Sequence, residues 1–230
     1  LGIASLIYPI SISRQIIKKE MPIMIVVTLL SILFLLDGNL TRFEGSIFFI
    51  GLIAYVVIGY KLSKTHASEE VPSSEVEAIK PISFGIAAIF IIVGLLMLVF
   101  GGNLFVDGAV EIAKKLKLSE AVIGLTIVAI GTSLPELFTS LIAALKKEAD
   151  IAIGNIIGSN IFNLIGILGL TSIIHPIQTE SISIIDYGLM FLLTLFLFPL
   201  LKTGMKLSRL EGLFLLIIYI VYIVFLLFYQ

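Results

Sequence analysis

Long apolar runs separated by short polar stretches form the main pattern along this chain. A helix needs roughly 20 apolar residues to cross a bilayer, and most of the runs approach that length. The runs cover about residues 1–10, 22–36, 43–60, 82–106, 119–145, 151–177, 183–201 and 210–229. The first run is too short to cross, so we interpret it as the end of a span. The pattern predicts an all-α integral membrane protein with about seven and a half transmembrane helices.

The composition agrees with a lipid bilayer as the surroundings of the protein. Of the 230 residues, 59% are hydrophobic and only 13% are charged, which leaves too few polar groups to cover a soluble domain of this size. The net charge of −1 argues against nucleic acid as a partner. The absence of Cys excludes disulfides, thiolate metal sites and cysteine catalysis from this chain.

A polar stretch, KLSKTHASEEVPSSEVEAIK at residues 61–80, divides the apolar runs and is interpreted as a loop. Placing this loop on the same side as three others puts most of the positive charge there. Eleven of the fifteen Lys and Arg residues then lie in 11–21, 61–80, 146–150 and 202–209. Cytoplasmic loops carry such an excess. We therefore expect a multi-pass plasma membrane protein with the 61–80 loop in the cytoplasm and the C-terminus outside. The shortness of this loop favours a prokaryotic type of protein.

Two segments of the chain occur twice at the same spacing. LGIASLIYPI at residues 1–10 matches LGLTSIIHPI at 168–177, and LTRFEG at 40–45 matches LSRLEG at 207–212. Leu1 and Leu168 are 167 residues apart, as are Leu40 and Leu207, so the two matches share one register. The second copy holds five spans, and an odd number inverts it relative to the first, as in many secondary transporters.

The repeat predicts an organisation of the whole chain. Residues 1–60 are expected to be the remainder of the first inverted repeat, 61–81 a cytoplasmic linker, and 82–230 the second repeat, with its central motifs at 124–170. The first copies of those motifs would precede Leu1. We therefore expect roughly 80 further N-terminal residues, ten helices in the complete protein, and only half of a functional site in this chain.

Glu136 is the one carboxylate that lies in the middle of an apolar run. A carboxylate at that depth is costly and normally faces a partner or an aqueous cavity. Ser133 and Thr132 precede it by three and four residues, so the three oxygen-bearing side chains are expected on one helical face. Pro135 has no N–H for the carbonyl of Gly131, which would leave that carbonyl free as a ligand. Hard oxygen donors of this kind suit Ca²⁺ and Na⁺. The alternative is a protonated Glu136 bonded to Ser133 as structural glue.

The next run carries a polar stripe. Asn155, Ser159 and Asn163 are spaced four apart and are expected to present neutral oxygens to Glu136. Asn160 lies off this stripe, where a hydrogen bond between helices would account for it. Gly154 and Gly158 form a GxxxG pattern that is typical of close helix packing.

These motifs resemble those of the sodium/calcium exchanger family. AIGTSLPELFTSL at 129–141 and GNIIGSNIFNLIG at 154–166 are similar to the second alpha-repeat of that family, and GNLFVDGA at 102–109 is similar to the stretch that precedes it in prokaryotic members. The resemblance implies an inverted-repeat antiporter with no cofactor, whose transported ions are Ca²⁺ and Na⁺. It also implies an ion-binding set in this chain: Glu136, Thr132, Ser133, the Ala129 carbonyl, Ser159 and Asn163.

The resemblance also bears on the counter-ion and the mechanism. Some relatives, including potassium-dependent ones, have Asp at the position of Asn163, so potassium dependence is not expected here. The GTSLPE motif favours Na⁺ over protons, and a Ca²⁺/H⁺ exchanger is the alternative. Ca²⁺ and Na⁺ would compete for overlapping sites, so alternating access would give exchange.

Two other classes of protein fit the sequence less well. An intramembrane enzyme with Ser133 as nucleophile would need His66 or His175 as its base, and neither lies near Ser133 in the sequence. A membrane interaction protein would not require a carboxylate, a Pro break and an amide stripe in adjacent spans. We therefore expect a transporter and no enzymatic activity.

Overall fold

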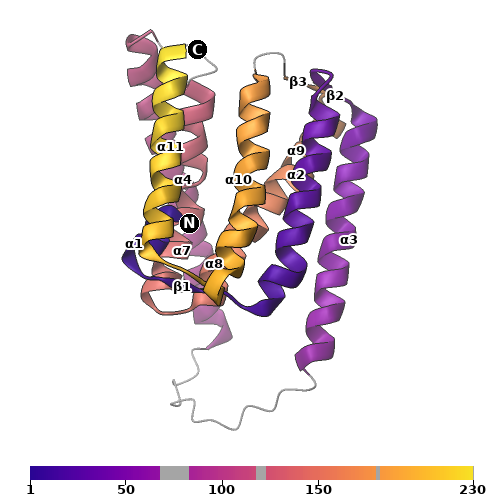
Figure 1. The fold of residues 1–230 in the computed structure, drawn as a ribbon, viewed down its shortest axis with the longest axis vertical. Helices are drawn as coiled ribbons and strands as arrows, with labels where there is room; N and C mark the ends of the chain where they lie inside the picture. Colours follow the sequence, from indigo (N-terminus) through magenta and orange to yellow (C-terminus); the bar gives the residue numbers. More distant parts are fainter. Residues whose placement is uncertain (68–82, 118–122, 180–181, 230) are drawn as a thin grey trace.

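The computed structural model describes residues 1–67, 83–117, 123–179 and 182–229, which fold into a bundle of long helices (Figure 1). α3 continues to Ala67, so the first residues of the expected 61–81 linker are helical. Residues 68–81 of the linker lie outside the described residues.

Within the described residues, three π-helical segments (η1–η3), one 3-10 helix (η4) and four very short strands lie among the α-helices. In chain order the elements are α1 (Gly2–Ile7), β1 (Ile10–Ser11), η1 (Ile16–Glu20), α2 (Met21–Leu35), β2 (Asn39–Leu40), α3 (Arg42–Ala67), α4 (Phe84–Lys115), η2 (Gly124–Val128), α6 (Ala129–Thr132), α7 (Leu134–Leu145), α8 (Ala149–Ile161), η3 (Phe162–Ile167), α9 (Leu168–Ile174), β3 (Ile177–Gln178), α10 (Ile184–Lys202), η4 (Thr203–Met205), β4 (Lys206–Leu207) and α11 (Arg209–Tyr229).

The predicted membrane spans are confirmed as helices. Within the described ranges, five helical stretches are long and apolar enough to cross a bilayer: 42–62, 84–115, 149–174, 184–205 and 209–228. A sixth candidate consists of residues 124–132 and 134–145, which are bent by 49° at a break. The 15-residue helix α2 follows η1 directly. Apolar side chains remain exposed along most of α4, as expected for a helix that faces lipid.

The two copies of the repeat make the same contacts twice, at opposite ends of the bundle. Ile10 pairs with Leu207 in the β1–β4 bridge, and Leu40 pairs with Ile177 in the β2–β3 bridge. Ile10 and Ile177 are equivalent positions, as are Leu40 and Leu207, so each bridge joins one copy to the other. Figure 1 shows β1 at one end of the bundle and β2 and β3 at the other, with α2 and its counterpart α10 running in opposite directions between them. This is the inverted-repeat architecture that the sequence predicts.

The buried core lies where α2, α8 and α10 meet, and it holds α8 in place. Met21 and Met24 of α2 pack with Ile153 and Ile157 of α8, all of them at most 4% exposed. Leu201 of α10 closes the same cluster. One face of α8 is thereby fixed in the core, and its other face is available for a site.

Candidate ion-binding site

The span that carries Glu136 is broken immediately before it. α6 ends at Thr132 and α7 begins at Leu134, and Ser133 between them leaves helical geometry with φ −92° and ψ 1°. Pro135 causes this break, because it cannot donate a backbone hydrogen bond and its ring crowds the preceding turn. Glu136 therefore lies in the first turn of α7. The positive end of a helix dipole stabilises an ionised carboxylate there.

One carboxylate oxygen of Glu136, Oε2, is buried without a hydrogen-bond partner among the described residues. An ionised oxygen without a compensating partner is costly away from water, and a bound cation or a proton removes that cost. The alternative of a glutamic acid bonded to Ser133 gains no support, since Oε2 makes no such bond.

A cavity of about 480 Å³ opens beside Glu136. Its walls come from α1, α6, α7, α8, η3 and α11. It brings together five of the six residues in the predicted ion-binding set: Ala129, Ser133, Glu136, Ser159 and Asn163. The described residues contain no cluster of three or more His, Cys, Asp or Glu side chains that could hold a metal ion. A cation in this cavity would therefore meet one carboxylate and several neutral oxygens.

Thr132 is the one residue of the predicted ion-binding set that does not line this cavity. Its hydroxyl donates to the carbonyls of Val128 (3.0 Å) and Ala129 (3.2 Å) in its own helix. The expectation that Thr132, Ser133 and Glu136 share one helical face assumed a continuous helix. The break at Ser133 turns α7 away from α6, so Thr132 and Glu136 no longer follow the same helical periodicity.

Gly131 also faces away from the cavity. A Cβ built at Gly131 would overlap the side chain of Val106, and a Cβ built at Gly102 would lie 3.7 Å from the Gly131 carbonyl oxygen. Gly131 thus permits close approach of α6 to α4. Its carbonyl lies near α4, on a different side from the ligand position expected for it.

The polar stripe of α8 divides into two parts. Ser159 and Asn163 reach the cavity, and the Ser159 hydroxyl donates to the carbonyl of Ile156 (3.1 Å), which leaves its lone pairs for a cation. Asn155 instead contacts α7, donating from Nδ2 to the Glu136 carbonyl (3.2 Å) and to the Ser140 hydroxyl (2.9 Å). From Phe162 onward the helix widens into η3, as often happens at functional sites.

Three polar residues at the cavity were not assigned to the site from the sequence: Ser140, Asn160 and Tyr219. Ser140 follows Glu136 by one helical turn, and that spacing could have identified it. The hydrogen bond between helices predicted for Asn160 is not the one it makes, because its amide donates to the carbonyl of Ile156 in its own helix at 2.8 Å. Tyr219 belongs to α11 and occupies the position equivalent to Leu52. A Tyr in one copy where the other has Leu is the one feature of the sequence that could have pointed to Tyr219 as a site residue.

The GxxxG pair has no close neighbour in the described chain. Nothing lies within 4 Å of a Cβ built on Gly154 or Gly158. The close helix packing expected of these glycines is therefore not made by the described residues.

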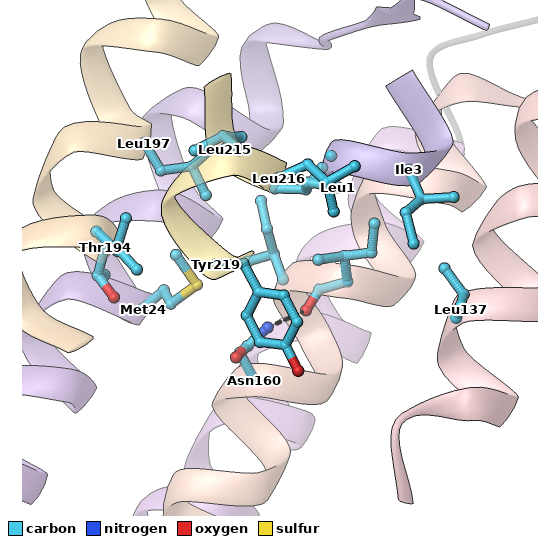
Figure 2. Close-up of a pocket in the computed structure, with 14 residues that line it drawn as sticks. Leu1, Ile3, Met24, Leu137, Asn160, Thr194, Leu197, Leu215, Leu216 and Tyr219 are labelled. Atoms are coloured by element: carbon cyan, nitrogen blue, oxygen red, sulfur yellow. Dashed lines mark hydrogen bonds between the residues drawn. The ribbon is translucent and has the colours of Figure 1, made fainter. Parts of the chain in front are cut away.

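A second cavity, of about 340 Å³, adjoins the first and is mostly apolar (Figure 2). It shares Asn160 and Tyr219 with the ion cavity and extends between α2, α10 and α11 to Met24, Leu197 and Leu215. The polar groups therefore gather on the Glu136 side, and the aliphatic side chains line the other.

The sequence model of the family described as "Sodium/calcium exchanger protein" matches residues 1–61 and 86–228 of this chain. The chain belongs to the sodium/calcium exchanger family. Membership in this family makes it a multi-pass membrane protein that exchanges cations.

Individual relatives agree with this assignment. The "Putative antiporter CaxA" of Alkalimonas amylolytica is 41% identical over 223 residues, which cover 94% of this chain and 70% of CaxA. The "Sodium/calcium exchanger MaX1" of Methanosarcina acetivorans is 49% identical over 92 residues, which cover 40% of this chain and 26% of MaX1.

The fold matches a solved exchanger. A structure of the sodium-calcium exchanger NCX_Mj soaked with Na⁺ and Sr²⁺ superposes with a TM-score of 0.74 at 31% identity, covering 97% of this chain and 70% of the NCX_Mj chain. The described helices thus have the arrangement of an exchanger of this family.

Proposed function

We propose that the complete protein exchanges Ca²⁺ for Na⁺ by alternating access, with Glu136 as the acidic ligand that both ions share. The observation that carries the proposal is the buried Glu136 Oε2, which has no partner within the described residues and borders a cavity lined by neutral oxygens. The names of NCX_Mj and MaX1 as sodium/calcium exchangers support the same substrates.

The donors around the cavity suit these two ions. Ca²⁺ takes six to eight oxygen ligands from carboxylates, carbonyls, amides and water. Beside Glu136, the proposed ligands are the Ser133 hydroxyl, the Ala129 carbonyl, Ser159 and Asn163, all at the cavity wall. Thr132 is left out of this set because, unlike the other predicted ligands, it does not line the cavity. The remaining ligands would come from N-terminal helices and water.

Exchange follows from the cost of an empty site. A carboxylate in a low-dielectric cavity is stabilised by one Ca²⁺ or by Na⁺ ions, and overlapping ligands prevent both from binding together. An uncompensated charge opposes the passage of the empty site between its inward and outward states. A Ca²⁺/H⁺ exchanger is the alternative, because a proton on Glu136 would also neutralise the charge; the name of CaxA as an antiporter fits either ion.

The orientation in the membrane is also proposed. The α7–α8 turn and the β1–β4 bridge lie at one end of the bundle, together with the C-terminal end of α3 (Figure 1). These are the segments rich in Lys and Arg, so we place this end in the cytoplasm. The end of α11 lies at the opposite, outer side.

Transport of Ca²⁺ by the complete gene product in proteoliposomes tests the function. At equal pH on both sides, uptake of labelled Ca²⁺ is expected when Na⁺ is present inside and absent outside. Collapse of the Na⁺ gradient with a sodium ionophore should abolish it. Uptake that ignores Na⁺ and follows an imposed pH gradient would establish the proton exchanger instead, and uptake driven by neither gradient would refute both.

A further inference from the structure

Asn155 joins the two helices that carry the candidate ion ligands. Its single Nδ2 group donates both of its hydrogen bonds to α7, one to the Glu136 carbonyl at 3.2 Å and one to the Ser140 hydroxyl at 2.9 Å. The two acceptors are one helical turn apart and share a face of α7. The carbonyl has a second lone pair, so it can accept this bond as well as the one within its helix.

The residues around this link are almost completely buried. Ser140 is 1% exposed, and Ile153 and Ile157 on either side of Asn155 are at most 1% exposed. The link is thus anchored in the core of the bundle. A buried hydroxyl with one fixed donor holds its partner helix at a defined separation.

The link lies one turn from Ser159 on α8 and at Glu136 itself on α7. Asn155 precedes Ser159 by four residues on α8, and on α7 the acceptor is the backbone of Glu136 itself. A change in the α7–α8 separation at this level would therefore move the Glu136 carboxylate relative to Ser159.

We propose that Asn155 is a positioning residue that fixes the distance between Glu136 and the neutral oxygens of α8, and that it thereby sets the preference of the site among divalent ions. This inference rests on the proposed function of Glu136 as a cation ligand. It also replaces the expectation that Asn155 offers its own oxygen to the ion: Ser159, Asn160 and Asn163 line the cavity, and Asn155 does not.

Replacement of Asn155 by Asp separates positioning from ligation. Asp has nearly the same shape and keeps its oxygens, but an ionised carboxylate cannot donate a hydrogen bond. If Asn155 positions α7, both Asn155→Asp and Asn155→Ala should raise the half-saturating Ca²⁺ concentration by about tenfold or more, as removal of outer-shell partners commonly does. If Asn155 is a ligand, Asn155→Asp should leave Ca²⁺ affinity unchanged or strengthen it, and the proposal is overturned.

The ratio of Ca²⁺ to Sr²⁺ affinity provides a readout that general loss of stability would not move. Without the link, the gap between α7 and α8 is free to widen, so the larger Sr²⁺ should lose less affinity than Ca²⁺. Ser140→Ala should shift the ratio in the same direction, and the double variant with Asn155→Ala should add little, because both changes remove one link. Thr28→Val is the matched control: it removes a buried hydroxyl that donates to Met24 of its own helix at 2.7 Å and joins no two helices. Variants with less transport activity but an unchanged ratio would assign Asn155 to folding alone and overturn the proposal.

A distance measurement keeps this test independent of the transported ion. Phe138 of α7 and Phe162 at the start of η3 are both 48% exposed and suit nitroxide labels through introduced Cys. In the complete gene product without added cation, Asn155→Ala should broaden the distance distribution between the labels, whereas Thr28→Val should not. An unchanged distribution would overturn the positioning role. If Ca²⁺ transport failed in the wild-type protein but the distribution still broadened, the proposed function would fall and the helix link would stand.

Discussion

Gly45 of α3 lies against the backbone of α9, where a Cβ built on Gly45 would come within 2.8 Å of the Gly169 carbonyl oxygen and overlap the Ser172 hydroxyl. The repeat makes the same contact again. A Cβ on Gly212 of α11 would lie 3.0 Å from the Gly2 carbonyl oxygen and overlap the Ser5 hydroxyl. Each copy therefore contributes one glycine helix and one small-residue helix, and the crossing always joins one copy to the other.

These crossings predict a position-specific effect of adding one methyl group. Gly45→Ala should lower the free energy of unfolding by about 1–3 kcal/mol, because the backbone of α9 cannot yield as a flexible side chain can. Gly51→Ala is the control in the same helix, where a Cβ meets nothing within 4 Å. It should be neutral or slightly stabilising, since Ala favours a helix more than Gly does. Thermal unfolding in detergent measures both, and equal effects would contradict the contact.

A second duplicated contact joins tyrosines to acidic residues near the helix ends. Tyr55 of α3 donates to Glu20 Oε2 at 2.6 Å, and Tyr222 of α11 donates to Asp186 Oδ1 at 2.7 Å. Tyr55 and Tyr222 are equivalent in the repeat, but Asp186 precedes the position equivalent to Glu20 by one residue. The contact is thus retained by two different acids at slightly different places.

Loss of either tyrosine hydroxyl should cost similar stability. Tyr55→Phe and Tyr222→Phe should each lower the free energy of unfolding by about 1.5–3 kcal/mol, the usual value of a hydrogen bond to a charged group. Tyr60→Phe, at a side chain that is 70% exposed, should change it by less than about 0.5 kcal/mol. Thermal unfolding of the three variants in one detergent checks the prediction. A marked difference between the losses of stability in Tyr55→Phe and Tyr222→Phe would show that the two equivalent hydrogen bonds do not contribute equally.

The sequence predicted the elements of this fold better than their contacts. Long apolar runs fix helices in a bilayer, and the 167-residue spacing revealed the duplication, because both are properties of the chain itself. The crossing of Gly45 with Gly169 was not predictable, since the repeat shows which residues are equivalent but not which ones meet. Glu136 was recognisable as a site residue because a mid-span carboxylate needs no structural context to be unusual.

The site was less predictable where the helix departs from regular geometry. The expected common face of Thr132 and Glu136 fails at the break before Pro135. Asn155 and Ser159 belong to one stripe by periodicity, yet one bonds α7 and the other lines the cavity. Hydrogen-bond partners depend on the tilt of neighbouring helices, which helical periodicity does not encode.

Ser133 and Thr132 are predicted to differ in their effect on ion binding. Ser133→Ala removes a hydroxyl at the cavity wall and should raise the half-saturating Ca²⁺ concentration about tenfold, the equivalent of one lost polar interaction. Thr132→Val removes a hydroxyl from a residue that does not line the cavity, so it should change the half-saturating Ca²⁺ concentration less than about threefold. Initial rates of Ca²⁺ uptake across a range of concentrations measure both. A larger effect at Thr132 would mean that its side chain turns into the site during transport.

Glu136→Gln keeps the shape of the side chain and removes its charge. Loss of one charge from a buried ion pair costs about 3–5 kcal/mol, so exchange of Ca²⁺ should fall more than about a hundredfold. Glu111→Gln is the control, because Glu111 is 69% exposed and pairs with Lys115 on the surface of α4. It should transport at nearly the wild-type rate. Retention of Ca²⁺ exchange in Glu136→Gln would remove Glu136 from the ion site.

The proposed orientation predicts opposite accessibility for two exposed positions. Lys146 lies at the α7–α8 turn, at the end that carries most of the Lys and Arg residues, whereas His175 follows α9 at the other end. This chain contains no cysteine, so single Cys substitutions in a complete protein without other Cys report one site each. In intact cells a membrane-impermeant maleimide should label His175→Cys and spare Lys146→Cys, and in inverted vesicles the order should reverse. The opposite result would invert the proposed orientation. The loops rich in Lys and Arg would then face outward, and the protein would be an exception to the positive-inside rule.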